Sequence, residues 1–121
     1  MKPVLINGDV WVINRVSPGN PLLIDRTGSY RAATTDPLTR SINISIEVTP
    51  PLLDSVLLHE VAHAITISYG LLDVLRSKIP YYLWVTVEEW AIAFLEKYSI
   101  EAIILASESL NRPLCINGKC I

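Results

Sequence analysis

Residues 55–66 of the chain read Ser-Val-Leu-Leu-His-Glu-Val-Ala-His-Ala-Ile-Thr, and this stretch contains both of its histidines, His59 and His63. Apolar residues recur here at three- and four-residue spacings, which predicts a helix over about residues 52–69, with Gly70 available to end it. Side chains four residues apart lie on one face of a helix, one turn apart. The two imidazoles can therefore point at a common ion, at the spacing that Zn²⁺ requires.

Glu60 follows the first histidine directly and supplies the carboxylate that such a site needs for catalysis. A carboxylate beside a zinc ion can act as general base toward water whose pKa the ion lowers. The alternative is that His59 and His63 are core histidines bonded to the backbone and that Glu60 lies at the helix surface. We favour the metal site because two imidazoles and a carboxylate on a buried helix are costly without a partner.

A catalytic zinc ion usually has three protein ligands and one open position, and no third histidine exists in this chain. The candidates are Glu88 and Glu89, at the start of the predicted last helix. A short helix at residues 71–78 and a turn at Pro80 leave enough chain to bring that last helix antiparallel to the first. The alternative is that both glutamates are first-turn residues favoured by the helix dipole.

The histidine pair and the stretch Glu88-Glu89-Trp90-Ala91-Ile92-Ala93-Phe94 together resemble gluzincin-type zinc metallopeptidases, specifically the compact ImmA/IrrE-like and bacteriophage-encoded members. The resemblance covers roughly residues 22–105. The family pattern Glu-x-x-Ala-x-x-Phe implies Glu88 as the third ligand, with Glu89 as the reserve. The family often carries Asp or Asn four residues after the ligand to orient a histidine. This chain has Ile92 there, so a backbone carbonyl or Glu89 is expected to take that role.

The predicted fold class is α+β, a minimal zincin with a small antiparallel sheet packed on the histidine-bearing helix and a long C-terminal helix, in one domain over residues 1–121. Residues 41–47 alternate polar and apolar, which predicts a strand with Ile42, Ile44 and Ile46 on its buried face. Further short strands are expected at residues 10–16, 22–25 and 30–34. The resemblance implies that the strand at residues 42–46 is the sheet edge along which a peptide substrate binds.

The last helix is expected to be capped by Thr86 and to reach about Leu110. Its apolar positions form a predicted inner stripe, which consists of Val87, Ala91, Phe94, Tyr98, Ala102 and Leu105. Trp90, Ile103 and Ile104 lie off that stripe. Other elements or a protein partner, including a second copy, are therefore expected to cover this helix.

Composition limits the partners and the cellular locations that are expected for the protein. The 121 residues include 10 Lys and Arg against 12 Asp and Glu, a net charge of −2, so nucleic acid is not expected as a partner. No apolar run reaches the roughly 20 residues of a membrane span, and the first residues do not form a secretory signal. We expect a location in the host-cell cytoplasm or in a virion.

Two cysteines, Cys115 and Cys120, flank a predicted Asn117-Gly118 turn. A reducing compartment favours free thiols; a local disulfide and a metal or redox role are the alternatives.

A developing oxyanion could be stabilised by the zinc ion itself or by hydrogen bonds from five candidate side chains, namely Tyr30, Arg31, Tyr69, Tyr81 and Tyr82.

The sequence therefore predicts a zinc metallopeptidase that hydrolyses peptide bonds of a protein or peptide substrate with a zinc-activated water. The resemblance to phage proteins implies a role in virion assembly or maturation. One alternative is a virion protein that binds zinc for structure without turnover. Another is a regulatory peptidase that acts on a repressor.

Overall fold

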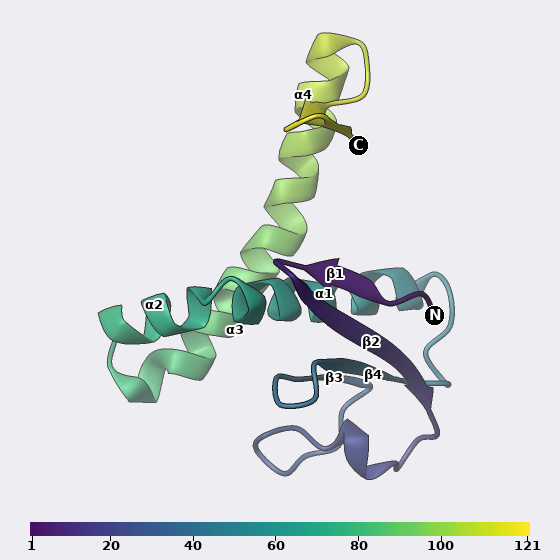
Figure 1. Ribbon diagram of the computed structural model, residues 1–121, viewed down its shortest axis with the longest axis vertical. Helices are drawn as coiled ribbons and strands as arrows, with labels where there is room; N and C mark the ends of the chain where they lie inside the picture. The colour runs from purple at the N-terminus through teal and green to yellow at the C-terminus, as the bar shows by residue number, and fades with distance from the viewer.

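A four-stranded sheet forms from the first third of the chain in the computed structural model, which describes residues 1–121 (Figure 1). The strands are β1 (Val4–Ile6), β2 (Asp9–Val16), β3 (Ala33–Asp36) and β4 (Ser41–Ser45), in the spatial order β1-β2-β4-β3. β1 and β3 pair antiparallel with their neighbours, but β2 and β4 are parallel. The prediction of an antiparallel sheet is therefore wrong for this central pair. The chain leaves β2 through a long loop and returns through the β3–β4 hairpin, which inserts β4 beside β2 in the same direction.

The loop between β2 and β3 contains a 3₁₀ turn, η1 (Pro21–Leu23), where a strand over residues 22–25 was predicted. Asn20 caps this turn because its side-chain oxygen accepts a hydrogen bond from the backbone N–H of Leu22, at 2.9 Å. Pro21 is the first residue of the turn, and its ring fixes φ near the value that a 3₁₀ turn requires. Extended pairing in this loop is limited to a single bridge between Ile24 and Tyr30. The strand predicted at residues 30–34 is displaced toward the C-terminus as β3.

The central strand β4 is buried on both faces. Ile42 and Ile44 are fully buried, as predicted, in the core that also includes Trp11 and Ala64. Ile46 lies beyond the end of β4 and is 53% exposed, so its predicted burial is wrong. β4 also lies inside the sheet, and β3 forms the edge, so the expectation that residues 42–46 form the substrate-binding edge is wrong as well.

Helix α1 (Leu52–Ser68) confirms the predicted histidine-bearing helix, and α2 (Leu71–Lys78) confirms the short helix after it. Gly70 separates them with a φ of 68°, in the left-handed region that glycine adopts without strain. The indole Nε1 of Trp11 donates a hydrogen bond to Ser68 Oγ at 2.7 Å, which ties β2 to the end of α1. The sheet therefore fixes the position of the helix that carries the histidines.

The last helical segment has three parts: α3 (Trp84–Phe94), the π-helical η3 (Leu95–Ser99) and α4 (Ile100–Leu110). It follows the short turn η2 (Tyr81–Leu83) and begins without a side-chain cap, so the prediction of a Thr86 cap is wrong. α3 packs against α1, whereas α4 extends away from the rest of the molecule (Figure 1). The outer half of the predicted inner stripe is therefore exposed, with Tyr98 at 47% and Leu105 at 56%.

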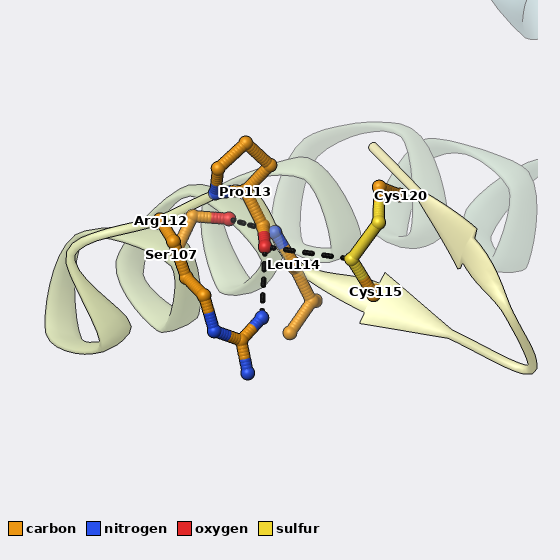
Figure 2. The surroundings of a disulfide bond; sticks show 6 residues. All are labelled: Ser107, Arg112, Pro113, Leu114, Cys115 and Cys120. Carbon is orange, nitrogen blue, oxygen red and sulfur yellow. Dashed lines mark hydrogen bonds between the residues drawn. A yellow bond between two sulfur atoms is a disulfide. The ribbon is translucent and has the colours of Figure 1, made fainter.

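The chain ends in a small hairpin of β5 (Cys115–Ile116) and β6 (Lys119–Cys120), where a disulfide joins Cys115 to Cys120 (Figure 2). The cysteines are thus paired locally and not free. The backbone N–H of Leu114 donates to Ser107 Oγ at 3.1 Å, which holds the hairpin beside α4.

No individual helix combines the length and apolarity that crossing a bilayer requires. α1 and α2 meet that criterion only when taken together, and they are bent by 78° at the break between them.

Candidate metal centre

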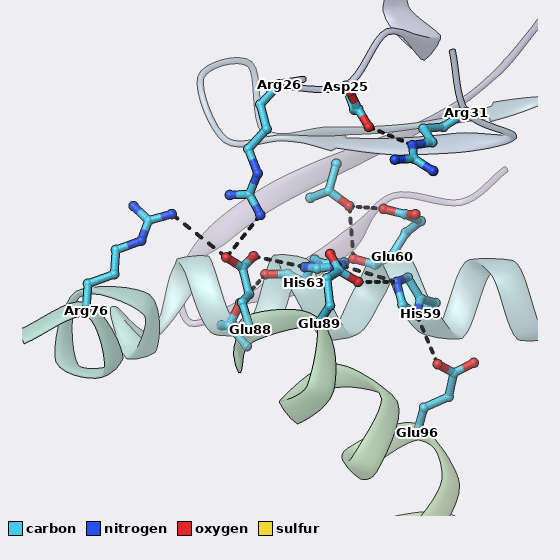
Figure 3. A network of polar contacts seen from close by, with 12 residues as sticks. Asp25, Arg26, Arg31, His59, Glu60, His63, Arg76, Glu88, Glu89 and Glu96 are labelled. Atoms are coloured by element: carbon cyan, nitrogen blue, oxygen red, sulfur yellow. Dashed lines mark hydrogen bonds and ion pairs between the residues drawn. The ribbon is translucent and has the colours of Figure 1, made fainter. Parts of the chain in front are cut away.

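Both histidine tips and one glutamate converge where α1 faces α3 (Figure 3). The Nε2 atoms of His59 and His63 are 3.2 Å apart. The carboxylate of Glu89 reaches both, with Oε1 at 3.3 Å from His63 Nε2 and Oε2 at 3.5 Å from His59 Nε2. One donor atom from each of the three residues lies within 4.8 Å of the others. Two imidazole nitrogens and a carboxylate oxygen are a donor set that catalytic zinc sites use, so these residues fit a zinc ion.

Glu88 lies on the other side of the His63 ring. Its Oε1 is 3.3 Å from His63 Nδ1, and its Oε2 is 3.3 Å from Arg26 Nη2 and 3.8 Å from Arg76 Nη2. Its side chain is only 5% exposed. Both carboxylate oxygens are thus engaged away from the Nε2 atoms. The geometry favours Glu89, the reserve candidate, over Glu88 as the third ligand.

Glu96, which was not among the predicted site residues, lies on η3 and contacts His59. Its Oε2 is 3.0 Å from His59 Nδ1. Each histidine therefore has a carboxylate at Nδ1, an arrangement that orients the ring and leaves Nε2 free for a metal. Glu96 follows Glu89 by two helical turns, so the two carboxylates share a face of the helix. This spacing is the sequence feature that could have predicted Glu96 as a neighbour of the histidines. Ile92, which stands where the family often has Asp or Asn, is fully buried and packs in the interior instead.

The protonation of His63 and Glu88 follows from their mutual contact. Burial lowers the pKa of His63, but the hydrogen bond with Glu88 and the charges of Glu89 and Glu60 outweigh burial, so the pKa is raised. Burial raises the pKa of Glu88, but the contacts with His63 and Arg26 outweigh this, so its pKa is lowered. Glu88 is thereby kept as a carboxylate that can hold the Nδ1 proton of His63.

Glu60 is buried and points toward the sheet edge. Its Oε2 accepts a hydrogen bond from Thr35 Oγ1, and the same hydroxyl lies 3.2 Å from the backbone oxygen of Glu60. Thr35 belongs to β3, so the edge strand holds the side chain expected to act as general base. Sequence reasoning did not identify Thr35, because a threonine in a short polar strand carries no distinctive pattern.

A cleft of about 900 Å³ runs between the β2–β3 loop with β3 on one side and the helices on the other. His59, Glu60, His63 and Glu89 all line it. Of the candidate oxyanion donors, Arg31 lines this cleft and the four tyrosines do not.

Asp25 fixes the position of Arg31 at the cleft wall. Arg31 Nε donates to Asp25 Oδ2 at 2.6 Å. Hydrogen bonds from Thr27 and then from Arg31 hold the pKa of the Asp25 carboxyl well below its usual range. The guanidinium of Arg31 is therefore anchored by a carboxylate while its other nitrogens remain available on the cleft side.

No known protein family, curated protein or solved structure matches this chain.

Proposed function

We propose that the chain is a zinc-dependent peptidase, in which His59, His63 and Glu89 hold the ion and Glu60 is the general base. The observation that supports this most directly is the convergence of both Nε2 atoms and the Glu89 carboxylate at one point of the cleft that Glu60 also lines. When bound there, zinc supplies a Lewis acid and lowers the pKa of water toward neutrality. Glu88 and Glu96 orient the two imidazoles through contacts with their Nδ1 atoms.

Glu60 carries the proton transfers of the proposed reaction. Its carboxylate accepts a proton from the attacking water and delivers it to the amine that leaves when the peptide bond breaks. Thr35 holds this carboxylate, and Arg31 offers guanidinium N–H groups at the cleft wall. Each step thus has a side chain of the appropriate chemistry lining the same cleft.

The proposed substrate path runs along β3. One side of β3 pairs with β4, and its residues also line the cleft, from Ala33 to Asp36. An extended peptide can add to the free side of an edge strand through backbone hydrogen bonds, which do not depend on sequence. This path brings the peptide backbone past Thr35 and Glu60.

The test of this proposal is zinc-dependent cleavage of a peptide mixture. The purified chain is expected to contain about one zinc per molecule, and to cleave peptides of a tryptic proteome digest, read by mass spectrometry. Chelation with phenanthroline should stop cleavage, and zinc should restore it. Absence of bound metal would refute the proposal. Bound zinc without cleavage would instead support a structural zinc protein, the alternative that the uncovered α4 favours.

Replacing Thr35 with Val is expected to lower kcat by about ten- to a hundredfold, because the Glu60 carboxylate loses a hydrogen bond that is worth about 1.5–3 kcal/mol when the acceptor is charged. KM and zinc content should change little, since the Thr35 hydroxyl bonds only Glu60 and no proposed metal ligand. Thr35→Ser keeps the hydroxyl and should retain most of the activity. Equal losses in the Val and Ser variants would show that Thr35 acts only through packing.

A further inference from the structure

We propose that a second copy of this chain covers an exposed apolar seam along α3, η3 and α4, to form an antiparallel helix dimer. The seam consists of Trp90, Phe94, Tyr98, Ala102 and Leu105. Trp90 is 66% exposed, and Phe94, Tyr98 and Leu105 are 46%, 47% and 56% exposed. The ring centroids of Trp90 and Phe94 are 5.4 Å apart and those of Phe94 and Tyr98 are 5.1 Å apart, so the aromatic part of the seam is continuous.

The chain itself provides no cover for this seam. α4 has no buried residue, and it extends from the body of the molecule with the C-terminal hairpin beside it (Figure 1). Its only extensive contact with another element is with η3, from which it continues. A short helix without tertiary packing is marginal in water, and a helix with this much apolar surface is normally buried. An association partner would supply the missing packing.

The size of the seam suits a symmetric dimer. The exposed parts of its side chains amount to on the order of 500 Å², against about 800 Å² that each partner buries in a standard interface. Flanking polar residues account for the remainder in an interface with an apolar centre and a polar rim. A patch of this size is about the largest that a typical monomer exposes, and such patches are often functional.

The order of residues along the seam favours a second copy in antiparallel orientation. Ala102 is small and lies between Tyr98 and Leu105, so two helices that cross there can approach closely. A two-fold axis at Ala102 places Tyr98 of each copy opposite Ala106 of the other, with Leu105 beside it. Tyr98 thus meets a small residue, and Phe94 comes opposite Leu110, which is 46% exposed, so apolar side chains of both copies are covered in this register.

Charges at the border of the seam agree with the same register. Lys97 and Glu108 are exposed and form no ion pair within the chain, and Lys97 Nζ lies 5.3 Å from the Tyr98 ring centroid. They are eleven residues apart, about three helical turns, and so lie on one flank. Two-fold symmetry brings each Lys97 to Glu108 of the other copy, which gives two opposite-charge pairs. Glu101 lies between them, and its two copies approach each other as like charges.

Sedimentation equilibrium and light scattering test this proposal on the full chain. The wild type is expected to dimerise with a Kd below about 10 µM. Leu105→Glu should raise the Kd at least a hundredfold, because it places two carboxylates in the apolar seam. Leu38→Glu is the matched control: Leu38 is 92% exposed outside the seam, and its replacement should leave the Kd unchanged.

A charge-reversal cycle tests the register. Lys97→Glu and Glu108→Lys should each raise the Kd about tenfold, because each creates two like-charge pairs, and the double variant should return to within about threefold of the wild type. Glu101→Gln should lower the Kd. A monomeric wild type at 100 µM, a Leu105→Glu variant that still dimerises, or a double variant no better than the single variants would each overturn the proposal. If the wild type is monomeric, the seam is instead expected to bind a different protein.

Discussion

Replacement of Glu60 with Gln is expected to reduce kcat/KM for peptide cleavage by about 10³-fold while the zinc content stays at the wild-type level. Gln cannot accept the proton of the attacking water, so the proposed general-base step is lost. The variant should still fold, because Gln has the same shape and its side-chain oxygen can accept the hydrogen bond from Thr35. The measurement combines steady-state kinetics on a peptide from the digest with metal analysis of the same sample.

Glu47→Gln is the matched control for this experiment, since Glu47 is exposed and does not line the cleft. Its activity should equal that of the wild type. If Glu60→Gln cleaves peptides at an undiminished rate, Glu60 is not the base, and the peptidase mechanism proposed here fails. A loss of zinc together with activity would assign Glu60 to the metal site and not to proton transfer.

A second large effect is expected in zinc affinity. His63→Ala should abolish stoichiometric binding, because one of two imidazole ligands is removed. Glu89→Gln should weaken zinc binding more than about a hundredfold, since a neutral amide replaces the proposed carboxylate ligand. Glu88→Gln should weaken it less, by about ten- to a hundredfold, as expected when a residue only orients a histidine. Competition with a fluorescent zinc chelator measures all three variants.

Stability separates these two glutamates independently of zinc. Glu88 is 5% exposed and contacts His63 and two arginines. Glu88→Gln should therefore lower the free energy of unfolding of the metal-free protein by about 1–3 kcal/mol. This is less than the loss for a fully buried ion pair, because Arg26 is 47% exposed. Glu89 is 48% exposed, and Glu89→Gln should change it by under about 0.5 kcal/mol. If Glu88→Gln has the greater effect on zinc and Glu89→Gln the smaller, the family-derived choice of Glu88 as ligand is restored.

The pairing of each histidine with its own carboxylate explains how this chain can orient two rings without an Asp or Asn at position 92. Glu88 and Glu96 occupy the Nδ1 sides, and Glu89 lies on the Nε2 side. Adjacent residues on a helix point about 100° apart, so Glu88 and Glu89 cannot face the same side of a ring. Their positions on different sides of the His63 ring follow from the rotation of α3 against α1.

The sequence alone determined the elements that depend on nearby residues. The apolar spacing around His59 and His63 predicted α1 and the common face of the two imidazoles, and Gly70 predicted its end. Alternation predicted the strand that buries Ile42 and Ile44. Periodicity within one or two turns is sufficient for such features, because backbone geometry fixes which side chains share a face.

Only the tertiary structure decided which distant residues meet. It placed β4 parallel to β2 and inside the sheet, and it brought Thr35 of β3 to Glu60. It turned Glu89 toward the histidine tips and left the seam along α3, η3 and α4 exposed. These outcomes depend on how the helices rotate and how the strands are ordered when the whole core packs. An apolar stripe on a helix predicts that another element buries it, but it does not identify which element or which chain does so.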